Sequence, residues 1–172
     1  MLRLFGLLLI FIACTLTGFF YAESLRKRSL ELKELERTLV QLKNEIMFLH
    51  SPLPEALKKI GERSKEPFSL LYIRISSYLE EGTCNSVFEA TVKSLEDYKD
   101  ILYLIKEDIE IIKDFSKNLG DLDRNFQINI FEMTLERVAM QIKDSEITAQ
   151  NNIKLYRYLG LCIGALVVIF LI

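Results

Sequence analysis

The partition of charge along the chain limits its possible folds more than any other feature of the sequence. Residues 4–22 form a run of 19 residues without a charged side chain, and residues 158–172 form a second run of 15. Residues 23–154 carry all 24 acidic residues and 20 of the 22 basic ones, a net charge of −4. Because hydrocarbon solvates neither charges nor unpaired backbone amides, we predict a water-exposed domain that is attached to a membrane at both ends.

The two predicted transmembrane spans are residues 4–22 and 155–172. The first is long enough to cross about 30 Å of hydrocarbon at ~1.5 Å per residue. A cleaved signal peptide is the alternative, but it requires small residues before the cleavage site, and three aromatic residues precede Ala22. The second span reaches 18 residues only if residues 155–157 are included, and its alternative is a buried C-terminal core helix.

The basic residues beside the two spans indicate the orientation. The outer tails hold only Arg3, whereas the inner flanks hold five basic residues. Cytoplasmic flanks of membrane spans are enriched in Lys and Arg, so residues 23–154 are expected in the cytoplasm and both termini outside. The five inner residues are Arg26, Lys27, Arg28, Lys154 and Arg157.

The first part of the central domain has the apolar pattern of one long helix. The two apolar rows of its seven-residue repeat are Leu25, Leu32, Leu39 and Ile46, and Leu35, Leu42 and Leu49. No Gly or Pro separates this segment from the first span, so one helix is expected from the membrane to about Leu49. This seam could join two copies in a coiled coil or pack against its own chain, and we favour the second because later segments carry matching stripes. The predicted core residues of the seam are Leu32, Leu35, Leu39, Leu42 and Ile46.

Five further helices are predicted after this one. Their expected ranges are about 55–63, 67–79, 85–95 and 98–119, followed by a last helix from Asp121 or Asp123. Gly120 is expected to end the fifth helix. The apolar stripe of the last helix fades after Ile142, which predicts looser packing towards the membrane. Because strand patterns are nearly absent, the predicted fold class is all-α: a cytoplasmic bundle of about six helices flanked by two transmembrane helices.

The sequence offers few residues for chemistry. His50 is the single histidine and lies where the first long helix is expected to break, which favours a packing role over a base or a metal ligand. The glycines form no phosphate-binding loop, and the negative domain has no basic stripe for nucleic acid. Cys84 is the only cysteine of residues 23–154 and has no disulfide partner there. We predict no catalytic residue, metal, cofactor or small-molecule substrate.

A pair of glycines in the second span indicates close helix packing. Gly160 and Gly164 are four residues apart and therefore share one face of a helix. Small residues at this spacing allow two membrane helices to approach closely. We expect these two glycines to contact another transmembrane helix.

Several short motifs follow one another along almost the whole chain. They are GFFYA at 18–22, EIM at 45–47, PLPEAL at 52–57, the stretch from Phe115 through Gly120 to Asp123 and Gln127, and YRYLG at 156–160 with Gly164. In this order they resemble the stage III sporulation protein AB family of endospore-forming bacteria. Two features depart from the family pattern. Cys84 lies in a variable loop, and this chain has Met47-Phe48 where the family is expected to have an aromatic residue soon after the Glu-Ile pair.

The resemblance implies a function and a set of partners. Members of this family are similar, in their soluble domain, to the cytoplasmic domains of the inner-membrane platform proteins of type II secretion and type IV pilus machines. The implied role is a non-enzymatic platform subunit of the channel between mother cell and forespore, in the mother-cell membrane that faces the forespore. The implied partners are a cytoplasmic secretion-type ATPase, stage III sporulation protein AA, and other membrane subunits of the same operon.

Two other classes of protein compete with this interpretation. A membrane-anchored coiled-coil receptor or sensor adaptor without a catalytic domain is the main alternative, and it would need a sizeable outer domain, for which the outer tails are too short. A membrane enzyme would need a cluster of polar residues, and the apolar stripes of the domain leave none evident.

Overall fold

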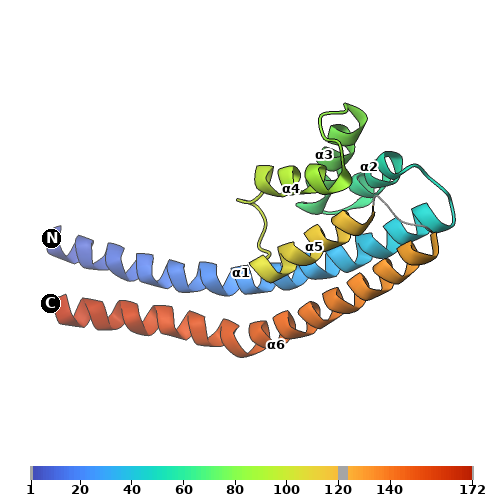
Figure 1. The fold of residues 1–172 in the computed structure, drawn as a ribbon. Helices are drawn as coiled ribbons and strands as arrows, with labels where there is room; N and C mark the ends of the chain where they lie inside the picture. The colour runs from blue at the N-terminus through green and yellow to red at the C-terminus, as the bar shows by residue number, and fades with distance from the viewer. Residues whose placement is uncertain (1, 120–123, 172) are drawn as a thin grey trace. The chain divides into compact units, whose positions relative to one another are not determined.

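The chain is all-helical. The structure, a computed structural model, describes the backbone of residues 2–119 and 124–171 and the side chains of residues 9, 11–119, 128–156 and 158–169. Six helices and no strand occur in that backbone (Figure 1), which confirms the predicted fold class. They are α1 (Leu2–Met47), α2 (Leu53–Arg63), α3 (Phe68–Glu80), α4 (Val87–Asp97), α5 (Lys106–Leu119) and α6 (Arg124–Leu171). Gly120, Asp121 and Asp123, with their predicted capping roles, lie outside the described residues.

The chain divides into two compact units. The first combines the two ends of the chain, Met1–Ser29 and Lys143–Ile172, and the second is the continuous segment Leu30–Ile142. α1 begins in the first unit and ends in the second, whereas α6 begins in the second and ends in the first. The first unit is therefore a pair of helices that includes both predicted spans, and the second holds α2 to α5 with the remaining parts of α1 and α6.

The core of the second unit is built on the apolar seam of α1. Leu32, Leu35, Leu39 and Leu42 expose at most 2% of their surface, and Ile46 is partly buried against the same core. Burial of each leucine contributes on the order of 2 kcal/mol to folding. The largest fully buried apolar side chains from the other helices are Phe68, Leu71, Phe131 and Val138. The seam is thus used within the chain, which leaves no room for a two-copy coiled coil through the same leucines.

α1 ends at Met47, before the predicted end at Leu49. His50 has a left-handed backbone conformation with φ 55°, and the N–H of Ser51 donates back to the carbonyl of Glu45 at 3.1 Å. The turn leaves Leu49 66% exposed and buries Met47, which is 4% exposed. Leu49 is therefore not part of the seam, because the helix stops before the seven-residue repeat reaches it.

α4 begins with a capping box. The hydroxyl of Ser86 accepts a hydrogen bond from the N–H of Glu89 at 3.1 Å, and the carboxylate of Glu89 accepts one from the N–H of Asn85 at 2.9 Å. The first bond pairs a backbone donor that the first turn of a helix leaves without a partner, and the second pairs the N–H of the residue before the cap. They fix the start of α4 at Val87, close to its expected position.

α5 begins at Lys106, so the helix predicted over residues 98–119 is wrong in its first two turns. Residues 98–101 form a turn, and residues 102–105 belong to neither a helix nor a strand. The apolar residues of this segment match helical spacing, but they match the alternating spacing of an extended chain equally well.

Two carboxylates bind the backbone of this segment. Glu31 on α1 accepts a hydrogen bond from the N–H of Tyr103 at 2.9 Å, and Asp108 accepts one from the N–H of Ile105 at 3.1 Å. Both carboxylate side chains are buried, with exposed fractions of 7% for Glu31 and 0% for Asp108. Such charge-assisted bonds replace the intrahelical bonds that these two amides would otherwise make.

The first unit is packed through small side chains. After Ile142, α6 buries Ser145 and Ala149, and α1 buries Ala22 and Ser29. The expectation that packing loosens after Ile142 is therefore wrong. The stripe changes from large to small residues because small residues let two helix backbones approach more closely.

Candidate functional site

A backbone contact between α1 and α6 lies within the first unit. A Cβ atom added to Gly18 would lie 2.7 Å from the carbonyl oxygen of Tyr156 and 3.0 Å from the Cα of Gly160. One added to Gly160 would lie 3.1 Å from both the carbonyl oxygen of Cys14 and the Cα of Gly18. Any side chain at Gly18 therefore forces the two backbones apart, since the atom it would meet is itself backbone.

Gly164 lies one turn further along the same face of α6. A Cβ atom at Gly164 would lie 3.1 Å from the ring of Phe11 and 3.4 Å from the Cβ of Cys14. The structure thus places Gly160 and Gly164 together against α1 and adds Gly18, which the sequence-based prediction did not single out. The signal was present in the sequence, because Cys14, Gly18 and Ala22 recur every four residues.

The two predicted spans lie side by side in an antiparallel arrangement. Gly18 meets Gly160, and the rings of Tyr21 and Tyr156 lie with their centroids 4.4 Å apart. Each tyrosine stands at the charged end of its predicted span. The two spans therefore overlap over most of their length, and their aromatic ends coincide as they do at a membrane interface.

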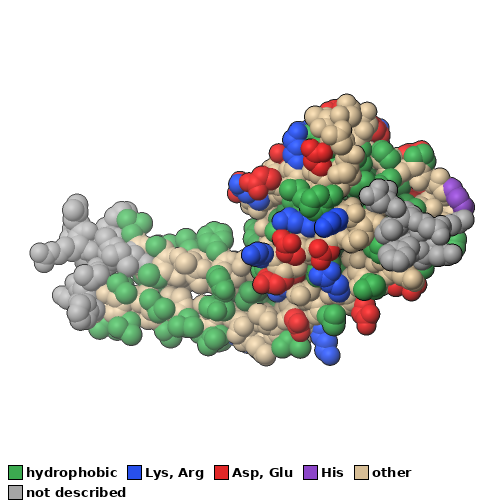
Figure 2. Space-filling view, in the orientation of Figure 1, with side chains coloured by type: hydrophobic (Ala, Val, Ile, Leu, Met, Phe, Trp, Pro, Cys, Tyr) green, Lys and Arg blue, Asp and Glu red, His purple; other side chains and the backbone are tan. Residues whose placement is uncertain are grey.

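The outer surface of this helix pair is apolar. The hydroxyls of Thr15 and Thr17 donate to the carbonyls of Phe11 and Ala13, both at 2.8 Å, so the helix itself satisfies them. Figure 2 shows hydrophobic side chains along these helices. Large exposed members of this surface are Leu9, Ile12, Leu16, Phe19, Phe20, Leu159, Leu161, Ile163, Leu166 and Ile169.

One helix of the described part of the chain is long and apolar enough to cross a membrane. It is the portion of α6 from Ile128 to Ile169, whose most apolar window has a mean hydropathy of 1.5 and is 12% buried. Core helices of soluble proteins can have the same composition, but they are mostly buried. The first predicted span falls partly outside the described side chains, as do Arg3 and Arg157, which were used to predict the orientation.

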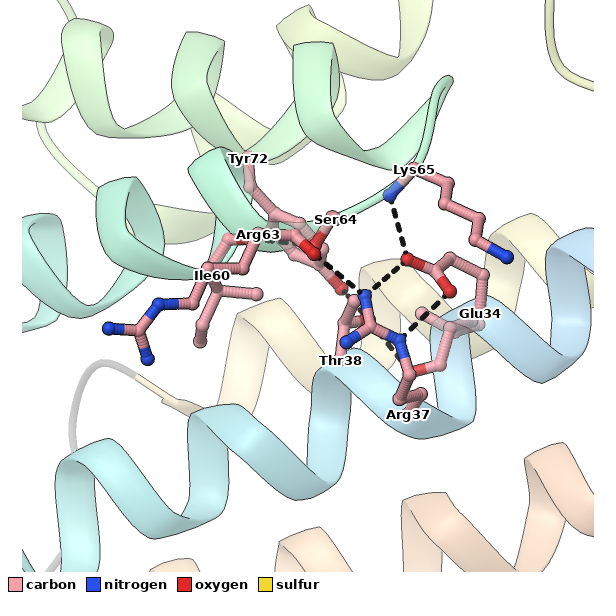
Figure 3. A network of polar contacts seen from close by, with 9 residues as sticks. Glu34, Arg37, Thr38, Ile60, Arg63, Ser64, Lys65 and Tyr72 are labelled. Atoms are coloured by element: carbon pink, nitrogen blue, oxygen red, sulfur yellow. Dashed lines mark hydrogen bonds and ion pairs between the residues drawn. The ribbon is translucent and has the colours of Figure 1, made fainter.

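A polar network joins α1 to the corner between α2 and α3 in the second unit (Figure 3). The carboxylate of Glu34 accepts two hydrogen bonds from the guanidinium of Arg37, one of them at 2.9 Å, and a third from the N–H of Lys65 at 2.8 Å. Arg37 also donates to the carbonyl of Arg63 at 3.2 Å. Side chains of α1 thus make hydrogen bonds with backbone groups at the end of α2 and just after it.

Burial and pairing shift the pKa values of this network. The hydrogen bonds from Arg37 lower the pKa of Glu34 below its ordinary value of 4.5, against the opposing effect of burial. Nearby, the hydroxyls of Thr38 and Tyr72 lie 2.8 Å apart, and burial raises the pKa of Tyr72 to about 12. Glu34 is therefore charged and Tyr72 neutral at physiological pH, so the network is a fixed ionic contact rather than a proton-transfer site.

A second polar cluster lies between α3 and α4. The hydroxyl of Tyr78 donates to the carboxylate of Asp97 at 2.7 Å, and Arg74 pairs with the same carboxylate at 3.4 Å. The cations of Arg74 and Lys93 each lie 4.3 Å from the centre of the Tyr78 ring. Cation–π contacts of this kind stabilise the packing of the two helices.

Neither cluster has the composition of a metal or catalytic centre. No group of three or more His, Cys, Asp or Glu side chains that could hold a metal ion occurs among the described residues. His50 lies at the exposed turn after α1, where its Nδ1 is 3.1 Å from the carbonyl of Phe48. The sequence did not reveal either cluster, because their members are brought together by helix packing rather than by a motif.

The fold and these contacts define a class of protein: an all-α protein with a charged helical unit and a close-packed, apolar helix pair. The family model described as stage III sporulation protein AB matches residues 3–172, and the chain belongs to that family. Stage III sporulation protein AB of Bacillus subtilis (strain 168) is 32% identical over 171 residues, which cover 99% of each chain. A solved structure of stage III sporulation protein AB (SpoIIIAB) matches with a TM-score of 0.67 and 30% identity, over 72% of this chain and 97% of that one.

Proposed function

We propose that this protein is a non-enzymatic membrane platform subunit of the channel between mother cell and forespore. Membership of the stage III sporulation protein AB family supports a role in sporulation. The observation that carries the platform role is that both α1 and α6 run unbroken, over 46 and 48 residues, from the charged unit into the apolar unit. Two continuous helices can transmit a displacement that a flexible linker would absorb.

The proposed partner on the cytoplasmic side is a secretion-type ATPase, stage III sporulation protein AA. The resemblance of the family to secretion platform proteins supports this choice, as does the apolar unit, through which the chain would contact other membrane subunits. In this proposal the first unit spans the mother-cell membrane that faces the forespore, with both termini outside and the second unit in the cytoplasm.

Site-specific crosslinking in sporulating cells tests the partners. A photo-reactive amino acid at Lys58, Phe88 or Met140, all exposed on the second unit, should yield a crosslink to the ATPase from at least one position. The same group at Phe20, in the first unit, should capture membrane subunits and not the ATPase. Absence of the ATPase from all three second-unit positions, in cells where the protein accumulates normally, would contradict the proposal.

Cysteine labelling tests the topology. Cys84 is only 6% exposed, so its failure to react would say nothing about the side of the membrane. A variant without the three natural cysteines and with Lys58→Cys, on exposed α2, should resist an impermeant thiol reagent in intact cells and react after lysis. Reaction in intact cells would reverse the proposed orientation.

A flexible insertion separates force transmission from simple recruitment. A short run of glycines between Ser24 and Leu30 interrupts α1 in a stretch where only Ser29 is buried. We expect ATPase crosslinking to persist and sporulation to fail. Normal sporulation of this variant would mean that the protein recruits the ATPase but transmits nothing through α1.

A further inference from the structure

The non-helical segment between α4 and α5 exposes a row of apolar side chains. Ile101, Tyr103 and Ile105 are 43%, 38% and 41% exposed, whereas the alternate residues Leu102 and Leu104 pack into the core of the second unit. Exposed and buried side chains thus alternate from Ile101 to Ile105, which places the three exposed residues on one face. Leu30 on α1 is also exposed, at 54%.

This face is held in place rather than loose. Its backbone is fixed by the hydrogen bonds from Tyr103 to Glu31 and from Ile105 to Asp108, and both acceptor carboxylates are buried. The side chain of Leu104 packs into the core of the second unit and holds the segment against it. Ordered apolar side chains that remain in water lose the hydrophobic stabilisation they could gain elsewhere, so a fixed apolar face indicates a contact.

Along the chain, this face is separated from the predicted first span by only a short stretch of α1. Glu31, which binds Tyr103, follows Ala22 by nine residues, a helical distance of about 14 Å. Helical side chains lean towards the N-terminus, so the carboxylate of Glu31 lies nearer to the span than its own Cα does. Figure 1 shows the segment between α4 and α5 at the end of the second unit where α1 enters it.

We propose that Leu30, Ile101, Tyr103 and Ile105 form a contact surface for the headgroup layer of the bilayer. The inference rests on the membrane anchoring of the proposed function. Tyrosine is enriched at this depth because its ring is apolar and its hydroxyl is wet.

The charges within the segment between α4 and α5 nearly cancel. Lys99 and Lys106 are exposed at the two ends of the segment and can reach lipid phosphates, but Asp100 and Glu107 are exposed next to them. The segment is therefore close to neutral. Arg26, Lys27 and Arg28 precede Leu30 on α1, so anionic lipid should strengthen the binding of the whole surface.

Tryptophan fluorescence in bilayers tests the proposal, because the natural chain contains no tryptophan. Tyr103→Trp, in the full-length protein reconstituted in vesicles, gives a single reporter in the segment, and Ile101→Trp gives a second. Phe88→Trp is the matched control, since Phe88 on α4 is 39% exposed, as Tyr103 is. Phe20→Trp reports on the predicted first span. Circular dichroism of each variant checks that it remains helical.

A nitroxide on the lipid headgroup should quench Tyr103→Trp and Ile101→Trp at least about twofold more than Phe88→Trp, as expected for residues at the interface. Equal quenching of the three would overturn the proposal. Protection of both segment reporters from the headgroup nitroxide and from aqueous iodide would also overturn it, and would indicate that another chain covers the segment. Failure of an acyl-chain nitroxide to quench Phe20→Trp would instead contradict the membrane anchoring itself.

Discussion

The two units of this protein are both made of packed helices, but they are packed with different residues. The contact in the first unit consists of Gly18, Ala22, Ser145, Ala149 and Gly160, with backbone almost touching backbone. The core of the second unit consists mainly of leucine, isoleucine and phenylalanine side chains. In water, burying large apolar side chains drives helices together, whereas lipid offers no such gain and favours close approach through small residues.

The polar groups of the two units differ in the same way. In the first unit, Thr15 and Thr17 bond back to their own helix. In the second, Glu34 connects α1 with the corner between α2 and α3, and Asp97 connects α4 with α3. A residue in lipid must satisfy its polar atoms nearby, while a domain in water can use ionic contacts that reach across its surface.

The largest expected effect comes from placing a charge in the core of the second unit. Leu42 is 1% exposed, so Leu42→Asp should destabilise this unit by about 4 kcal/mol or more, because the buried carboxylate has no partner. Thermal unfolding followed by circular dichroism in detergent measures this. Val40→Asp is the control, since Val40 is 42% exposed on the same helix and its replacement should change little. Equal effects of both variants would show that the seam is not a core.

Enlarging the small-residue contact should have a smaller effect, confined to the first unit. Gly18→Leu or Gly164→Leu should cost roughly 1–3 kcal/mol through overpacking. Hydrogen exchange in micelles should show faster exchange in residues 11–29 and 143–164, with the second unit unchanged. Ala13→Leu, on the exposed side of α1, should have no such effect. If Gly18→Leu packs as well as the natural chain, the close contact is not what holds the helix pair together.

The Glu34–Arg37 network should add a pH dependence that belongs to the second unit alone. The pKa of Glu34 is lowered in the folded protein, so its contribution is present above its ordinary value of 4.5 and is lost as pH falls through the folded pKa. Glu34→Gln should destabilise by about 1–2 kcal/mol at neutral pH and by less in acid. Denaturation at a series of pH values measures this against Glu62→Gln, which removes an exposed carboxylate from α2. A loss that does not change with pH would exclude the ionic contact.

The smallest effect concerns the turn after α1. His50 has φ 55°, which costs any residue with a side chain more than it costs glycine. His50→Gly should therefore stabilise the second unit by about 0.5–1 kcal/mol, and His50→Ala should not. The melting temperatures of the two variants and of the natural protein test this prediction. A loss of stability in His50→Gly would mean that the imidazole itself contributes to the turn.

The sequence by itself determined what depends on local patterns. The charge partition separated apolar ends from a charged middle, the seven-residue repeat identified Leu32 and Leu42 as core, and the breaks at Pro52 and Gly82 bounded the short helices. These features follow from periodicity and backbone preference, which act between residues close in the chain.

Only the tertiary structure decided what depends on residues far apart in the chain. Residues 102–105 are not helical because Glu31, 72 residues before Tyr103, accepts the N–H of Tyr103, and no local pattern encodes that bond. Gly18 is a contact residue because Gly160 lies against it, and the distance between them in the sequence hides their pairing. In each case the free energy of a contact between distant segments, rather than local preference, selects the conformation.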